Sequence, residues 1–284
     1  MPHQLKERMM PEWVVESSQL SDVGQKRRHN EDYVGLYEPH RIADLEAHGR
    51  LYVLADGVGG AAAGDVASQY AVSRILHAYY HSAGDDLGTR LRLAIEEANA
   101  EIYARNLDRP DNREMATTVV AALIRGDDLI VANVGDSRAY LIRGEGIEQV
   151  TEDHSLVAEM ISDGAITAEQ AATHPYRNVI LRSVGAYETV QVDLFVRQLA
   201  PDDIIILCSD GLTRLVSNRE LVDIGRAYPH AEAVRQLVAL ANERGGEDNI
   251  SVSLTYVSGD QVQGDIPGAG RLPEMPHWED LQHT

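Results

Sequence analysis

Residues 51–57 have the sequence LYVLADG, and residues 204–211 have the sequence IIILCSDG. In each stretch an apolar run of strand length ends at an aspartate that is followed by glycine. Asp-Gly is a frequent turn dipeptide, so Asp56 or Asp210 alone indicates only that the chain turns as it leaves a strand. The recurrence of the pattern predicts a sheet that carries carboxylates along one end.

Other acids stand at the ends of further predicted strands. They are Glu31, Asp32, Asp136 and Asp248. Because neighbouring strand ends in one sheet lie close together, we expect these acids to form a cluster with Asp56 and Asp210, which is costly unless a counter-charge offsets it. A divalent cation supplies that charge, and carboxylates, carbonyls and water are the ligands that Mg²⁺ and Mn²⁺ prefer. The glycine after Asp56 lets the backbone come close, so the carbonyl of Gly57 is a further candidate ligand.

A pair of hard cations held by carboxylates is suited to the hydrolysis of phosphate esters. Two ions about 4 Å apart lower the pKa of a shared water and hold the oxygens of an in-line displacement. The phosphate also needs a cation from the protein, and Arg27, in GQKRRHNED, is placed to bind its oxygens. Arg27 could instead be a surface arginine in a basic patch with Lys26 and Arg28. Beside the acids we favour the phosphate role.

Composition excludes several classes of protein. The chain has 284 residues, with 25 Lys+Arg against 45 Asp+Glu and a formal net charge of −20. This charge argues against binding to nucleic acid or to anionic membranes, since both need a basic face. The single cysteine, Cys208, excludes an internal disulfide and a multi-cysteine metal site. No apolar run has the length of a membrane span and no signal peptide is visible, so we expect a cytoplasmic protein.

Strands and helices alternate along most of the chain. Apolar runs predict strands at 13–19, 33–37, 51–55, 116–124, 128–134, 138–143, 190–196, 203–208 and 249–256. Periodic aliphatic residues predict helices at about 62–81, 88–107 and 230–243. Capping boxes at Thr167 and Ser217 predict two shorter helices. The strands within 116–150 are joined by short turns, which predicts one antiparallel meander.

The pattern predicts one domain with a short extension at each end. Residues 1–12 are polar and unpatterned, and we expect a flexible arm there. Residues 13–257 form the predicted domain. Residues 258–284 hold four glycines and three prolines without a strand pattern, which predicts a disordered acidic tail. Trp278, in the sequence WEDL, could mark a docking motif, but a solvated tail is the simpler interpretation.

Several motifs occur in a fixed order between about Ser21 and Val257. They include SDVGQKRRHNED, LADGVGGAAAGDVAS, VANVGDSRAYLIR, TEDHSLVAEM, HPYRNVILRSVG, IILCSDGLT and GEDNISV. In this order they resemble the motifs of the metal-dependent protein serine/threonine phosphatases of type 2C in their bacterial form. The resemblance implies an α+β fold, a four-layer αββα sandwich of two antiparallel β-sheets flanked by helices, with a dimetal centre at one end.

The resemblance also implies roles for individual residues. It implies that Asp56 bridges two metal ions. Asp210 and Asp248 would complete the first ion's site, and Glu31 with the Gly57 carbonyl would serve the second. Asp136 with Asp210 corresponds to a possible third ion's site. The catalytic residues it implies are Arg27, which holds the substrate phosphate, and Asp32, which supports the acid cluster. Residues 155–180 correspond to the flap, an element beside the site that affects substrate access.

The activity implied is hydrolysis of phosphoserine and phosphothreonine in proteins. In this family a water that bridges two Mn²⁺ or Mg²⁺ ions attacks phosphorus directly, without a phosphoenzyme. The partners implied are phosphorylated proteins and a Ser/Thr protein kinase that the enzyme opposes, and we expect a monomer. One departure concerns the general acid, because Val58 stands where eukaryotic members have a histidine. We interpret His29 and His154 as surface or structural residues, since no partner that would tune their pKa is evident.

Two other functions fit parts of the sequence. Cys208 and Arg214 have the C-x5-R spacing of cysteine-dependent phosphatases, in which a thiolate attacks phosphorus. However, Cys208 ends an aliphatic strand, where an inert buried thiol is expected, and Asp210 would place a negative charge inside the anion cradle. A non-catalytic phosphoprotein-binding module of the same fold is the second alternative. Such a module would lack some of the metal acids, whereas this chain keeps them all.

Overall fold

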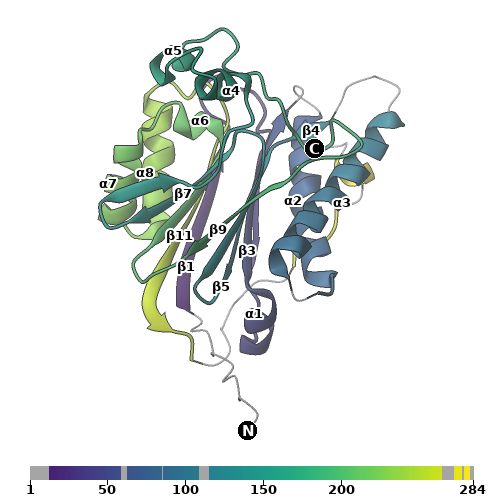
Figure 1. Ribbon diagram of the computed structural model, residues 1–284, viewed down its shortest axis with the longest axis vertical. Coiled ribbons are helices and arrows are strands. Elements are labelled where there is room, and N and C mark those ends of the chain that lie inside the picture. Colours follow the sequence, from purple (N-terminus) through teal and green to yellow (C-terminus); the bar gives the residue numbers. More distant parts are fainter. Residues whose placement is uncertain are drawn as a thin grey trace.

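A computed structural model of the chain shows two antiparallel β-sheets packed face to face between two layers of helices (Figure 1). It describes residues 13–58, 63–84, 86–108, 115–263, 272–276 and 278–281. The helix pair α2 (Gly64–His81) and α3 (Leu87–Leu107) covers one sheet, and the pair α7 (Asn218–Ala227) and α8 (His230–Glu243) covers the other. The predicted four-layer sandwich is therefore confirmed. None of the described helices is long and apolar enough to cross a membrane.

The first sheet has the strand order β1-β11-β10-β7-β8. Its strands are β1 (Trp13–Asp22), β7 (Arg138–Arg143), β8 (Gly146–Gln149), β10 (Ile204–Cys208) and β11 (Ile250–Gln261). The second sheet has the order β2-β3-β5-β6-β9, and β4 pairs with β3. Its strands are β2 (Asp32–Tyr37), β3 (Arg50–Val58), β4 (Ala116–Thr117), β5 (Val119–Arg125), β6 (Asp128–Val134) and β9 (Asp193–Gln198).

The helices predicted from periodicity and from capping boxes are confirmed. The long ones are α2 (Gly64–His81), α3 (Leu87–Leu107) and α8 (His230–Glu243). Thr167 caps α5 (Ala168–Ala172) and Ser217 caps α7 (Asn218–Ala227), each in a reciprocal capping box. The sequence did not predict α1 (Ile42–His48). The remaining helices are α4 (Leu156–Ser162), α6 (Asp210–Thr213) and α9 (Trp278–Leu281).

The strands β3 and β10, which carry the sequences LYVLADG and IIILC, are covered on both faces. In β10, Ile204, Ile206 and Cys208 pack towards α7 and α8, whereas Ile205 and Leu207 pack between the sheets. In β3 the same alternation places Leu51, Val53 and Ala55 under α2 and α3, and Tyr52 and Leu54 between the sheets. Because side chains alternate along a strand, a strand with a layer on each face needs apolar residues at every position. This explains the continuous apolar runs.

The prediction of one meander over 116–150 is wrong. β5 and β6 pair in the second sheet, whereas β7 and β8 pair in the first, so the chain changes sheets between Val134 and Arg138. Gly135 makes this crossing possible, since its φ is +113° and an added Cβ would lie 2.6 Å from the Thr118 side chain. Both hairpins have the short turns that the sequence showed. Periodicity alone does not say which sheet a hairpin joins.

The prediction of a disordered tail over 258–284 is wrong for part of that segment. β11 continues to Gln261, beyond the predicted domain end at residue 257. Leu272, Met275 and Trp278 pack against the hydrophobic cluster to which side chains of α2 and α3 contribute, and Leu281 is only 5% exposed. Trp278 is therefore not part of a solvated tail. The predicted flexible arm, residues 1–12, lies outside the described residues.

The layered core predicts a clear contrast between two leucines. Leu54 is fully buried between the sheets, whereas Leu93 on α3 is 49% exposed. We expect Leu54→Ala to lower the free energy of unfolding by about 3 kcal/mol, because it removes buried methyl groups and leaves a cavity. Leu93→Ala should change it by less than about 0.5 kcal/mol. Urea unfolding measures both, and equal effects would contradict this placement of the core.

Candidate metal centre

The acids predicted from strand ends meet at one end of the sandwich. Asp32 opens β2 directly opposite Asp56 in the β2–β3 register, and Asp210 begins α6 just after β10. Asp248 stands two residues before β11. A cavity of about 140 Å³ lies between these strand ends. Its lining includes six of the residues singled out from the sequence, namely Arg27, Glu31, Asp56, Gly57, Asp210 and Asp248.

Crowding of like charges sets the electrostatics of this cavity. Burial, followed by the charges of Asp32 and Asp210, raises the pKa of Asp56 well above its ordinary value. Burial likewise raises the pKa of Glu31, and Arg27 partly offsets this. The carboxylates are therefore unfavourable as bare anions, and added positive charge at this end would relieve the repulsion.

Two of the acids carry oxygens without a protein partner. Asp32 and Asp136 are 5% and 6% exposed, and in each the Oδ1 atom is buried without a hydrogen bond in the described structure. Burial is the main reason that the pKa of each rises to about 7. Buried oxygens without partners beside several other carboxylates form a donor set suited to a hard divalent cation.

Gly57 adds a backbone carbonyl at the same place. An added Cβ would lie 2.2 Å from the carbonyl oxygen of Gly64 and 2.7 Å from that of Glu31, so only glycine fits. The Gly57 amide donates to the Glu31 carbonyl at 3.0 Å. Close packing of these backbones holds the start of α2 against the acid cluster. The residues at this end therefore fit Mn²⁺ or Mg²⁺ in ligand chemistry.

Two arginines stand among the acids. Arg27 Nη2 lies 2.9 Å from Asp248 Oδ2, and Arg214 pairs with Asp210 and lies 3.8 Å from the same Asp248 oxygen. No three Asp, Glu, His or Cys side chains among the described residues are gathered around a single ion position. The guanidinium groups balance the acids in this arrangement. The sequence had singled out Arg214 only as part of the C-x5-R spacing.

Asn249 organises the site and was missed from the sequence. Its Oδ1 accepts from the Glu31 amide at 2.9 Å, and its Nδ2 donates to the carbonyls of Val23 and His29 at 3.0 and 2.9 Å. One buried side chain therefore ties both ends of the loop that carries Arg27 to the start of β11. The sequence shows only an asparagine between Asp248 and a predicted strand, and asparagine is common in surface turns.

Hydroxyl groups hold the two acids that oppose each other in β2 and β3. Thr118 Oγ1 accepts from the Asp56 amide at 3.0 Å, and the Thr118 amide donates to the Asp56 carbonyl at 2.8 Å. Ser209 Oγ donates to Asp32 Oδ2 at 2.8 Å and accepts from the Ser251 amide at 2.9 Å. Asp32 does not line the cavity, so this geometry suits a positioning residue.

Asp136 sits on a turn that His154 secures. His154 Nδ1 accepts from the Gly135 amide at 3.0 Å, and its Nε2 lies 2.9 Å from Asp193 Oδ2. Arg182 also binds Asp193, at 2.9 Å. Burial lowers the pKa of His154, which keeps Nδ1 free to accept. His154 is thus structural, as interpreted from the sequence, and His29 is exposed, as that interpretation allowed.

A larger cavity of about 580 Å³ adjoins the acids beneath the predicted flap. It shares Asp210 and Arg214 with the smaller cavity and contains Asp136. α4 and α5, which lie within the flap, supply an apolar wall to it: Val157, Ala158, Ile161, Ala168, Ala171 and Ala172. The cavity therefore combines an apolar wall with a charged end.

The structure contradicts the thiolate alternative. Cys208 is fully buried, and burial raises the pKa of its thiol to about 12. Its side chain belongs to the core under α7 and α8, and Arg214 is paired with Asp210. A thiol in this position is neither ionised near neutral pH nor accessible to a substrate.

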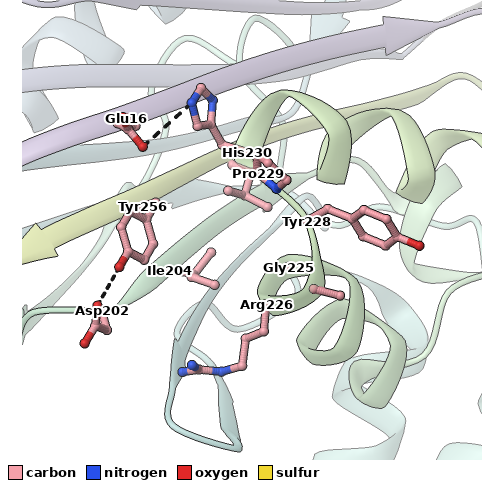
Figure 2. Close-up of a pocket in the computed structure, with 11 residues that line it drawn as sticks. Glu16, Asp202, Ile204, Gly225, Arg226, Tyr228, Pro229, His230 and Tyr256 are labelled. Carbon is pink, nitrogen blue, oxygen red and sulfur yellow. Dashed lines mark hydrogen bonds and ion pairs between the residues drawn. The ribbon is translucent and has the colours of Figure 1, made fainter.

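A further hollow lies at the other end of the first sheet, between β11 and the α7–α8 turn (Figure 2). It has a volume of about 430 Å³. Both of its acids have partners in the hollow, since Tyr256 donates to Asp202 at 2.5 Å and His230 lies 3.9 Å from Glu16. None of the acids in the cluster lines it. The acid end of the sandwich is therefore the candidate site.

Comparison with known proteins identifies the family to which the chain is similar. A family model described as protein phosphatase 2C matches residues 25–254. Serine/threonine phosphatase Stp of Listeria monocytogenes is 38% identical over 256 residues, which cover 88% of this chain and 96% of that protein. Protein phosphatase PhpP of Streptococcus pneumoniae is 38% identical over 254 residues, which cover 88% of this chain and all of that protein.

Solved structures share the fold at similar identity. The serine/threonine phosphatase of S. agalactiae superposes with a TM-score of 0.79 at 36% identity, covering 86% of this chain and all of that one. The phosphatase PstP of Mycobacterium tuberculosis gives a TM-score of 0.76 at 35% identity, covering 86% of this chain and 99% of that one. A structure of the PstP catalytic domain in complex with two manganese ions gives a TM-score of 0.74 at 34% identity, covering 86% of this chain and 99% of that one.

The raised pKa values predict how stability depends on pH in the chelated protein. Asp32 and Asp136 titrate near pH 7 when folded, against about 3.9 in an unfolded chain. The folded state therefore binds protons that the unfolded state has released, and stability falls as the pH rises from about 4 to about 7. We expect calorimetry to show a Tm about 5 °C lower at pH 8 than at pH 5.

The control for this prediction is Asp136→Asn, which removes one of the two titrations. Its Tm should fall less steeply over the same pH range. Saturating Mn²⁺ should flatten the wild-type profile, because bound cations favour the charged carboxylates. Identical slopes in the chelated wild type and the variant would contradict the raised pKa of Asp136.

Proposed function

The chain belongs to the protein phosphatase 2C family, and we propose that it hydrolyses phosphoserine and phosphothreonine in proteins with two divalent cations held at its acid end. It is a serine/threonine phosphatase of the bacterial kind, as its relatives are. The observation that carries the proposal is the convergence of Glu31, Asp56, Asp210 and Asp248 on one small cavity. The similarity to the PstP catalytic domain, whose structure holds two manganese ions, supports Mn²⁺ as the cofactor.

We assign the metal ligands as the family resemblance implies, among residues that line the cavity. Asp56 would serve both ions, Asp210 and Asp248 would complete the first site, and Glu31 with the Gly57 carbonyl would serve the second. Asp136 and Asp210 would hold a third ion. When bound, Mn²⁺ or Mg²⁺ would supply a water of lowered pKa and a Lewis acid for the phosphate oxygens.

The lining of the small cavity favours attack by water over a covalent phosphoenzyme. Among the described residues it contains no thiol, hydroxyl or imidazole side chain, and the carboxylates that could otherwise attack phosphorus are the ones that we assign as metal ligands. Val58 lines the cavity without offering a proton, so we assign protonation of the leaving oxygen to water. Asp32, held by Ser209, would keep Asp56 in place as a positioning residue.

Two arginines would bind the substrate phosphate. The Arg27 side chain is 47% exposed and reaches the cavity from its own loop, and Arg214 reaches it from the end of α6. In the proposed complex each guanidinium would pair with phosphate oxygens in place of its aspartate, and the aspartates would be free to serve as metal ligands. A guanidinium matches two phosphate oxygens at once, which a lysine cannot do.

The larger cavity is our candidate for the peptide on either side of the phosphorylated residue. It opens from Asp210 and Arg214 and runs under the apolar wall of α4 and α5. A Ser/Thr kinase would phosphorylate such substrates, and the enzyme would oppose that kinase. A purely phosphopeptide-binding role is disfavoured because every acid of the proposed ligand set is in place.

Loss of one ligand tests the metal site. We expect Asp56→Ala and Asp210→Ala each to lower Mn²⁺-dependent turnover of a phosphothreonine peptide by about 100-fold or more, because each removes a charged ligand. Phosphate release at saturating Mn²⁺ is the measurement. Asp223→Ala is the matched control, since this aspartate is half-exposed on α7 and far from the cavity.

Chelation and alkylation complete this test. A chelator should abolish turnover, and thiol alkylation should spare it because Cys208 is buried. Near-normal turnover in either aspartate variant would remove the site assignment. Loss of activity on alkylation but not on chelation would remove the metal mechanism.

Loss of Arg27 tests the phosphate contact. We expect Arg27→Ala to raise KM about tenfold with a smaller change in kcat, because the guanidinium binds phosphate in both ground and transition states. Arg27→Lys should recover only part of the loss, since an ammonium cannot make the paired contact. Steady-state kinetics on one phosphopeptide separates the two constants. A change confined to kcat would argue against this role.

A further inference from the structure

The C-terminal segment is seated on the outer surface where α2 and α3 meet. We call this surface the α2–α3 seam and define it by Tyr70, Arg74, His77, Glu101 and Arg105. The ring of Trp278 stacks on Tyr70 of α2 with centroids 3.7 Å apart and planes at 21°. The guanidinium of Arg105, on α3, lies 5.9 Å from the centre of the Trp278 ring. One aromatic side chain therefore touches both helices.

The segment is held at more than one point. His77, two turns beyond Tyr70 on α2, donates from its ring to the carbonyl of Pro273. Leu272 and Met275 pack against the same core, and Leu281 is 5% exposed one helical turn after Trp278. These contacts run along α2, so the segment lies on the helix over about two turns, from Tyr70 to His77.

Hydrogen bonds between α2 and α3 hold the seam in shape. Tyr70 donates its hydroxyl to Glu101 of α3, and Arg74 of α2 donates to the same carboxylate at 3.0 Å. These bonds orient the Tyr70 ring and neutralise Glu101. The aromatic face that Trp278 covers is therefore fixed by α2 and α3 rather than by the segment. A rigid aromatic face of this kind needs little reorganisation to accept a ligand.

The segment lies beyond the residues that the family model matches. The family match ends at residue 254, and the S. agalactiae phosphatase is covered completely by 86% of this chain. β11 ends at Gln261 in the first sheet, whereas α2 and α3 cover the second. The segment thus reaches the opposite helix layer from the one that packs on β11 (Figure 1).

α2 connects the seam with the acid cluster. Ser68, near the start of α2, donates its hydroxyl to the Glu31 carbonyl at 2.6 Å. An added Cβ on Gly64 would lie 2.8 Å from Glu31 Oε2, so the first turn of the helix packs directly on that side chain. Tyr70 follows Ser68 by two residues on the same helix. A contact that steadies α2 at Tyr70 therefore also steadies the backbone that holds Glu31.

We propose that the α2–α3 seam is a docking surface for a short peptide of the form Trp-x-x-Leu. The chain's own segment Leu272–Leu281 occupies this surface in cis. Its docking steadies α2 at the acid cluster. Trp278 and Leu281 are the two anchors, one helical turn apart on the same face of α9. Tethering raises the local concentration of the segment to the order of mM, so modest contacts suffice to keep it docked.

The test uses the full chain with both anchors removed, Trp278→Ala together with Leu281→Ala. A fluorescent peptide of residues 272–284 is titrated into this variant and followed by anisotropy, and amide hydrogen exchange of α2 is measured with and without it. We expect the peptide to bind below about 1 mM, the limit set by the effective concentration in cis. Exchange in α2 should be about tenfold faster in the variant and should slow again when the peptide binds.

Two controls make the result specific, and a substitute variant covers a failure to fold. The same peptide with Trp278→Ala should not bind, and full-length Glu274→Gln, which changes an exposed residue of the segment, should exchange like the wild type. Should the double variant fail to fold, Arg105→Ala replaces it, with acrylamide quenching of Trp278 in a Trp13→Phe background as the readout. Quenching should then rise, since Trp278 is the only other tryptophan.

Two results would overturn the proposal. One is α2 exchange in the folded double variant equal to that of Glu274→Gln. The other is failure of the peptide to bind the exposed seam at mM concentration. Neither readout depends on catalysis, so the proposal stands or falls separately from the phosphatase mechanism.

Discussion

Repulsion among buried carboxylates is the constraint around which this protein is built. Burial and neighbouring charge raise the pKa of Asp56, Asp32 and Asp136 together, so the cluster is stable only with positive charge beside it. Arg27 and Arg214 supply that charge in the structure. The same imbalance underlies the divalent-cation site that we propose, and these acids account for part of the net charge of −20.

Holding such a cluster requires a rigid frame, and the four-layer sandwich provides it. β3 and β10 are buried on both faces, so neither strand can shift without disturbing two layers of the core. Side-chain hydrogen bonds then fix the acids locally. Asn249 ties down the Glu31 loop, Thr118 holds Asp56, and Ser209 holds Asp32. The proposed cation site and the frame of the fold therefore share the same strand ends.

The sequence predicted elements well where the pattern is local. Capping boxes at Thr167 and Ser217 and the long periodic helices lie where we expected them, because the bonds that define them join residues close in sequence. The 116–150 meander was wrong, because two hairpins look alike whether or not they share a sheet. α1 was missed, since no side chain caps its start. The tail was judged from its glycines and prolines, which say nothing of the surface that Trp278 contacts.

The sequence by itself determined the fold class, the family and the acids of the site. Continuous apolar runs that end in Asp-Gly mark strands with a layer on each face, and motif order identifies their arrangement. Only the tertiary structure decided that Arg214 faces the acids, that Asn249 joins three segments, and that Trp278 covers a joint between two helices. The reason is physical. Each of these roles depends on contacts between segments far apart in the chain, and the identity of one residue carries no record of its distant neighbours.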